Sequence, residues 1–200
     1  MKKITWLLMT AFVLWHDATA QVKAGLEQYY FMKNKTIAIN PKAWYQSETG
    51  WYVEGRYNYE AAQTVSVITG KTFDYESDFS FSVTPMAGVV AGKFNGGVIG
   101  GNASADYKKC QFSLQTQYAF SGDSRSCNFM YSWADLSYAV SGSLSAGISM
   151  QKTRMYRVRG QSEAGFFLKG VFGNWELPLY IFNPCGNDRY AVLGLSISLE

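Results

Sequence analysis

Apolar and polar residues alternate with a period of two along most of this chain, and no other feature restricts its possible folds as strongly. In residues 51–60 the odd positions are mostly aromatic, while the even positions carry all of the charges. The same alternation recurs in residues 79–91 and 191–199. A period of two places one set of side chains on each face of a β-strand. The pattern therefore predicts an all-β protein whose strands have one apolar and one polar face.

The alternation changes phase once. Apolar residues occupy odd positions in 129–133 and even positions in 136–140. A β-bulge inserts one residue into a strand and would shift the alternation by one position. Because no turn residues stand there, we expect a bulge near Ala134 and Asp135 rather than two short strands.

The first twenty residues have the pattern of a secretory signal. Lys2 and Lys3 precede an almost unbroken apolar run, and small residues occupy positions 18 and 20. We therefore predict that residues 1–20 are a cleaved signal peptide and that residues 21–200 form a single β-barrel domain. The one histidine, His16, lies in the signal. The mature chain then lacks the residue that Ser-His, Cys-His and His-metal chemistries require.

The low charge content separates two β architectures. Only 16% of the residues are charged and 16% are aromatic. A soluble barrel needs charge on its water-facing side, whereas a membrane barrel turns its apolar face to lipid and its polar face inward. The strands between turn signals are also long enough to cross a bilayer when tilted. The sequence thus favours a closed antiparallel transmembrane β-barrel of about twelve strands, with ten possible and with short periplasmic turns.

The turn signals divide into two sets under a twelve-strand scheme. One set is expected at the periplasmic end and the other at the outward end, and the outward turns are longer on average. The periplasmic turns are those near Ser47, Asp74, Lys108, Ser141 and Gly173, and the outward turns are those near Glu60, Lys93, Asp123, Arg157 and Cys185. Aromatic residues near strand ends suit the interfacial girdles of such barrels, and they are Tyr57, Tyr59, Tyr107, Phe120, Tyr138 and Trp175.

Segments such as "WYVEGRYNYE" and "NFMYSWADLSY", together with the signal peptide, resemble the small outer-membrane β-barrel proteins of Gram-negative bacteria. They are especially similar to uncharacterised Bacteroidetes-type barrels. The resemblance covers most of the mature chain and implies a barrel located in the cell outer membrane. Its motifs are aromatic patterns, so it implies no functional residues.

Three groups of residues are candidates for a site. Charged residues predicted to line the lumen are Glu54, Arg56, Glu60, Asp106, Lys169 and Glu176. A basic segment is predicted on an outward loop and consists of Lys152, Arg154, Arg157 and Arg159. It is either a plain solvated loop or a group that binds lipid phosphate or draws anions to a pore mouth. Cys127 and Cys185 are expected near the same end of the barrel, so a disulfide between them is one hypothesis and three free thiols is the other. No metal or cofactor site is predicted.

The predicted function is a non-enzymatic barrel, either a narrow porin-like diffusion channel or a passive structural or surface barrel. One alternative is a soluble periplasmic β-barrel that binds an apolar ligand. Another is an enzyme that uses carboxylates alone, with Glu54 or Glu60 as acid or base. The expected partners are outer-membrane lipid and small solutes. Nucleic acid is excluded because the net charge is only +3 and no basic tract accompanies it. No oligomeric state is predicted.

Overall fold

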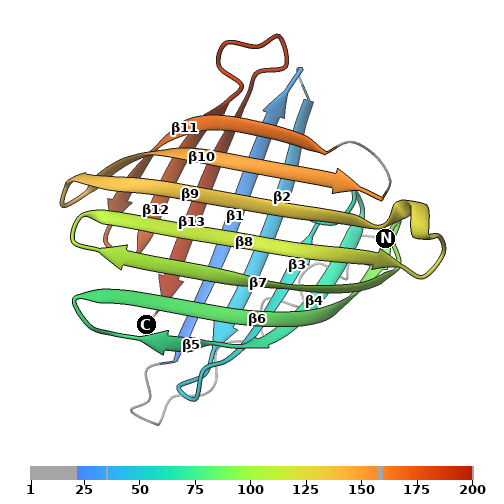
Figure 1. The fold of residues 1–200 in the computed structure, drawn as a ribbon, viewed down its shortest axis with the longest axis horizontal. Helices are drawn as coiled ribbons and strands as arrows, with labels where there is room; N and C mark the ends of the chain where they lie inside the picture. The colour runs from blue at the N-terminus through green and yellow to red at the C-terminus, as the bar shows by residue number, and fades with distance from the viewer. Residues whose placement is uncertain (1–21, 35, 157–159, 200) are drawn as a thin grey trace, which may run out of the picture.

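The computed structural model describes residues 22–34, 36–156 and 160–199, and these residues form an antiparallel β-barrel (Figure 1). The predicted signal peptide lies outside the described residues. The only helix in the described part is the short η1 (Arg125–Cys127), and no helix there is long and apolar enough to cross a membrane. The strands are β1 (Lys23–Lys33), β2 (Thr36–Gln46), β3 (Trp51–Tyr57), β4 (Thr64–Lys71), β5 (Phe73–Tyr75), β6 (Phe79–Gly92), β7 (Gly96–Tyr107), β8 (Cys110–Ser121), β9 (Phe129–Ser141), β10 (Leu144–Met155), β11 (Gln161–Phe172), β12 (Trp175–Phe182) and β13 (Tyr190–Leu199).

The sheet closes on itself with twelve positions around its wall. Neighbouring strands pair in sequence order, and β1 pairs antiparallel with β13. Both β4 and the three-residue β5 pair with β6, one after the other along its length. They are therefore two parts of one interrupted wall position, which confirms the predicted count of twelve. In Figure 1 the strands β5–β11 cross in front of β1, β2, β12 and β13, as expected for the tilted walls of a barrel.

The connections alternate between two ends of the barrel. Short turns, 47–50, 76–78, 108–109, 142–143 and 173–174, lie at what we call the short-turn end, where β1 begins and β13 ends. At the opposite, long-loop end lie longer connections such as 58–63, 122–128 and 183–189. The turn at 47–50 depends on a glycine, since Gly50 has a φ of +81°, a conformation that L-residues with a side chain rarely adopt.

The apolar faces of the strands point outward, as predicted for a membrane barrel. Large side chains such as Val89 (68% exposed) and Ile148 (63% exposed) form a belt around the outside. Exposed aromatic residues gather near the short-turn end, among them Trp51, Phe79, Tyr107, Tyr138 and Trp175. A belt of this kind with an aromatic girdle is the lipid-facing surface of a transmembrane barrel. A soluble barrel would bury these faces, so that alternative is not favoured.

Strand β9 differs from the prediction. Ala134 and Asp135 pair in continuous register with both β8 and β10, so the predicted bulge is absent there. The β9–β10 register shifts only at the short-turn end, between Leu144 and Ser145. The change of phase in the sequence has another cause. Trp133, like Phe129 and Tyr131, faces the interior, whereas the apolar residues of the other strands mostly face lipid.

Candidate functional site

A cavity of about 650 Å³ lies inside the barrel. It extends from Ser82, near the start of β6 at the short-turn end, to Met155, the last residue of β10 at the long-loop end. This volume would hold roughly 20 water molecules. One part of its wall is aromatic and includes Tyr29, Phe31, Tyr59, Phe129, Tyr131, Trp133 and Tyr180. Another part carries amides and hydroxyls from Asn40, Ser82, Thr84, Asn102, Ser104, Ser113, Gln115, Gln117, Gln151 and Thr153.

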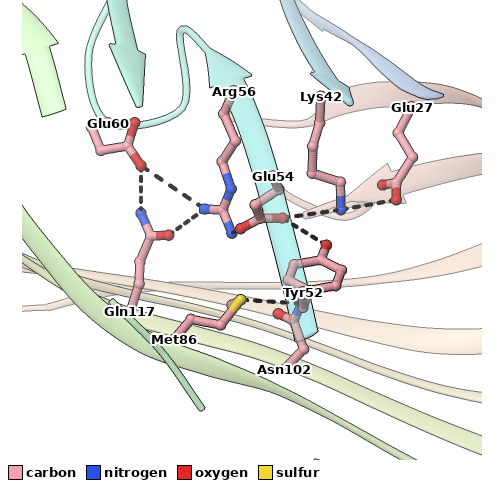
Figure 2. Close-up of polar contacts among 9 residues, drawn as sticks. All are labelled: Glu27, Lys42, Tyr52, Glu54, Arg56, Glu60, Met86, Asn102 and Gln117. Carbon is pink, nitrogen blue, oxygen red and sulfur yellow. Dashed lines mark hydrogen bonds and ion pairs between the residues drawn. The ribbon is translucent and has the colours of Figure 1, made fainter. Parts of the chain in front are cut away.

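Five charged side chains form one buried network, which we call the Arg56 cluster: Glu27, Lys42, Glu54, Arg56 and Glu60 (Figure 2). Arg56 Nη2 forms an ion pair with Glu54 Oε1, and Arg56 Nη1 lies 3.9 Å from Glu60 Oε1. Lys42 Nζ lies 2.8 Å from Glu27 Oε1 and 4.0 Å from Glu54 Oε2. Strands β1, β2 and β3 supply these groups at alternating, inward-facing positions, and Glu60 comes from the loop after β3.

Hydrogen bonds tie the Arg56 cluster to the opposite wall. Tyr52 donates its hydroxyl hydrogen to Glu54 Oε2 at 2.9 Å. Arg56 Nη1 donates to Gln117 Oε1 at 2.5 Å, and Gln117 Nε2 donates to Glu60 Oε1 at 3.4 Å. Gln117 lies on β8, which is separated from β3 by β4, β6 and β7. These contacts therefore cross part of the lumen and narrow it. Figure 2 shows the side chains of Arg56, Glu60 and Gln117 that make them.

Three buried polar atoms at the edge of this cluster make no hydrogen bond in the structure: Arg56 Nε, Glu60 Oε2 and the Tyr59 hydroxyl. The Tyr59 ring faces the Arg56 guanidinium at 5.2 Å and lines the cavity. Tyr59 is therefore not part of the lipid-facing girdle to which the sequence assigned it. Burial raises the pKa of the Tyr59 hydroxyl above its ordinary value, so the group stays protonated and can donate a hydrogen bond at neutral pH.

Trp133, on β9, also narrows the lumen. Its ring lies 5.5 Å from that of Tyr29 on β1 and 5.1 Å from that of Tyr180 on β12, although β9 is adjacent to neither strand. Its Nε1 donates to Asp135 Oδ1 at 2.8 Å. Ser149 Oγ donates to the same oxygen at 2.5 Å, and the Tyr180 hydroxyl donates to Asp135 Oδ2 at 3.0 Å.

The other charged residues predicted for the lumen gather at the short-turn end. Lys169 Nζ lies 3.6 Å from Glu176 Oε1 and donates to Gln111 Oε1 at 3.0 Å. Gln111 Nε2 donates in turn to Asp106 Oδ1 at 2.9 Å. The six predicted residues thus form two groups at different heights, and only Glu60 among them lines the cavity itself.

The basic segment is placed differently from the prediction. Lys152 and Arg154 lie within β10, on the same outward face as Ile148 and Met150 and close to the long-loop end, rather than in a loop. Arg157 and Arg159 lie outside the described residues.

The structure contains three free thiols, as in the second of the two cysteine hypotheses, and no Cys127–Cys185 disulfide. Cys127 and Cys185, like Cys110, are exposed free thiols. The described residues also contain no group of three or more His, Cys, Asp or Glu side chains arranged to hold a metal ion.

Sequence reasoning missed Glu27, Lys42 and Asp135 as members of the site. Lys42 joins Glu27 because the β1–β2 register pairs these two residues directly. Asp135 lies two positions after Trp133 on the same face, a signal that the predicted bulge obscured. The spacing of Trp133 and Asp135 could have identified a polar group on an aromatic interior face.

No protein-family model and no curated protein matches the chain. Solved structures of porins do share its fold. The KdgM porin is 12% identical over 88% of this chain and 99% of its own, with a TM-score of 0.62. The KdgM porin in complex with disordered oligogalacturonate has a TM-score of 0.63 at 11% identity and the same coverage. The NanC porin has a TM-score of 0.58 at 12% identity over 88% of this chain and 99% of its own. These similarities show the barrel fold. The apolar belt is what supports the predicted place in a membrane.

Proposed function

We propose that this protein is a non-enzymatic diffusion channel of the outer membrane that passes small polar solutes. The observation that carries the proposal is the cavity, whose lining residues are distributed from Ser82 near the short-turn end to Met155 at the long-loop end and include many amides, hydroxyls and charges. A passive structural barrel would not need a polar cavity of this extent. The similarity to Bacteroidetes-type barrels remains a prediction.

The arrangement of the carboxylates argues against the enzyme alternative. Glu54 is 1% exposed and is held by Arg56, Tyr52 and Lys42, so its oxygens are already engaged. An acid–base pair needs a proton-transfer group that can reach a substrate. Glu60 has one oxygen without a partner, but Glu54 does not line the cavity. The two carboxylates therefore do not form such a pair.

We also propose that Lys152 and Arg154 contact lipid phosphate. Both lie on the lipid-facing side of β10, near the end where the strand leaves the apolar belt. Phosphate headgroups lie at that depth in a bilayer, and charge-assisted hydrogen bonds to phosphate are strong.

The channel proposal is tested by folding the mature protein into vesicles, establishing insertion by protease protection, and recording current across a planar bilayer. We expect stable single-channel steps. Trp133→Ala should raise the unit conductance, because the indole crosses the lumen to contact Tyr29 and Tyr180. The matched control is Trp175→Ala, which removes a lipid-facing indole and should leave the conductance unchanged. Inserted barrels that never conduct would overturn the proposal.

A further inference from the structure

The charged residues that line the cavity are unbalanced. They are Glu27, Lys42, Glu60 and Asp135, which are three carboxylates and one ammonium group. At neutral pH the cavity wall therefore carries a net charge of −2 when all four groups are ionised. This imbalance stands out because the complete sequence has a net charge of +3.

Arg56, which does not line the cavity, does not cancel this excess, because Glu54 is paired with it. The whole Arg56 cluster contains three carboxylates and two cations, so it sums to −1. Arg56 has its charge divided between Glu54 and Glu60, and Lys42 lies against Glu27 and Glu54. One carboxylate of the cluster therefore has no cation of its own. Glu60 fits this description best, because its Oε2 makes no hydrogen bond and its Oε1 lies 3.9 Å from Arg56 Nη1.

Asp135 supplies the second unit of negative charge. Its three hydrogen-bond donors, the Trp133 indole and the Ser149 and Tyr180 hydroxyls, are all neutral. An ionised carboxylate can accept all three bonds, whereas a protonated one would have to donate one. No ion pair to Asp135 forms among the described residues, so these bonds stabilise its charge without neutralising it.

Four other basic residues in the described part of the chain do not line the cavity: Lys33, Lys152, Arg154 and Lys169. Lys152 and Arg154 point outward from β10. Near the long-loop end, Lys33 is 3.6 Å from Glu163. At the short-turn end the group of Asp106, Lys169 and Glu176 again carries one negative charge more than positive.

We infer that the lumen selects for cations over anions, with Glu27, Glu60 and Asp135 as the groups that set this preference. The inference rests on the proposed channel function and adds the class of solute. A narrow path with low-dielectric walls of one sign concentrates ions of the opposite sign. A polyanion such as oligogalacturonate would meet three carboxylates here, so small cations are the expected cargo.

The first experiment uses the unmodified protein in a planar bilayer with a KCl gradient. We expect a reversal potential on the cation-selective side, with a potassium-to-chloride permeability ratio on the order of threefold to tenfold at about 0.1 M salt. The ratio should fall toward one at about 1 M salt, because the Debye length shortens from about 10 Å to about 3 Å. Replacing chloride by glutamate should preserve the current, whereas replacing potassium by N-methyl-D-glucamine should reduce it.

The second experiment changes the wall. Glu60→Gln with Asp135→Asn brings the cavity wall to zero charge and should bring the permeability ratio close to one. Adding Glu27→Gln leaves Lys42 in excess and should reverse the sign of the reversal potential. The matched control is Glu48→Gln with Asp123→Asn, which removes two carboxylates from exposed connections and should keep the selectivity of the unmodified channel.

The outcomes separate the two proposals. A conducting channel that prefers chloride, or that shows no preference at about 0.1 M salt, overturns the cation inference and leaves the channel function standing. Block of the potassium current by digalacturonate would also contradict it. Inserted barrels that never conduct overturn both. Because the measurement on the unmodified protein needs no variant, a failure of the triple variant to fold would not remove the test.

Discussion

At the scale of single residues, the chain places its few charges where they are costly. Glu54 and Arg56 are 1% and 3% exposed, inside a barrel whose outer surface is apolar. Removing two ions from water costs several kcal/mol per ion, and only close partners offset this cost. Removing one member of such a pair therefore destabilises the fold much more than replacing both members with apolar residues. The odd–even pattern alone was sufficient to place Glu54 and Arg56 inside, because the face of a strand residue is a local property.

Arg56→Ala should destabilise the barrel by about 3–5 kcal/mol, because it leaves Glu54 and Glu60 buried without their cation. The measurement is the free energy of unfolding from urea titration of the vesicle-inserted protein. Arg125→Ala is the control, since Arg125 lies in η1, none of whose residues is buried. It should change the stability by less than about 0.5 kcal/mol. A loss below about 1 kcal/mol for Arg56→Ala would contradict the role given to the Arg56 cluster.

At the scale of single elements, β9 and β10 show where period-two reasoning succeeds and where it fails. In β10 the alternation correctly turns Leu144, Ile148 and Met150 to the outside. In β9 hydrophobicity was a misleading guide to orientation, since Trp133 packs against aromatic rings from β1 and β12 across the lumen. An apolar face indicates lipid only where the interior is polar. Part of this interior is aromatic, and the alternation could not reveal that.

The double variant Lys152→Gln with Arg154→Gln should lower the thermal stability of the barrel in vesicles that contain lipopolysaccharide. Each basic residue near a phosphate surface contributes about 1 kcal/mol, so we expect a loss of about 2 kcal/mol. The loss should be absent in zwitterionic phosphatidylcholine. Samples are heated to a series of temperatures and then run on a gel. The measurement is the temperature at which the band of the folded form disappears.

Lys71→Gln provides the comparison for that experiment. Lys71 lies on the outer face at the short-turn end, beside Trp51, and donates a hydrogen bond to the Thr49 carbonyl. Its effect should be the same in both lipids. Equal losses for the double variant in the two lipids would mean that Lys152 and Arg154 do not bind phosphate.

At the scale of the whole molecule, the closed barrel has two ends, and the cysteines are divided between them. β1 pairs with β13 along its length, so the start of β1 and the end of β13 lie together at the short-turn end. Cys127 and Cys185 lie in long-loop connections, whereas Cys110 begins β8 beside the turn at 108–109. The three free thiols can therefore report which end faces the cell exterior.

In intact cells, a membrane-impermeant maleimide should label Cys127 and Cys185 and should not label Cys110 until the envelope is permeabilised. This follows from the predicted orientation, with the long loops outside, and from the absence of the disulfide in the structure. Mass spectrometry of peptides from the labelled protein, which keeps all three cysteines, gives the measurement. Labelling of Cys110 alone in intact cells would reverse the orientation, and protection of both Cys127 and Cys185 that a reducing agent removes would restore the disulfide hypothesis.

Local sequence patterns were sufficient to predict the β class, a count of about twelve wall positions, and the faces of most strands. These depend on the local alternation and on turn residues, which act over a few positions along the chain. The groups that meet across the lumen could be identified only in the folded barrel: Arg56 with Gln117, and Trp133 with Tyr29 and Tyr180. Those contacts join strands that are not neighbours, so they depend on closure and register of the whole barrel. The charge of the cavity is decided at that level too, because it counts only the groups that closure brings to one wall.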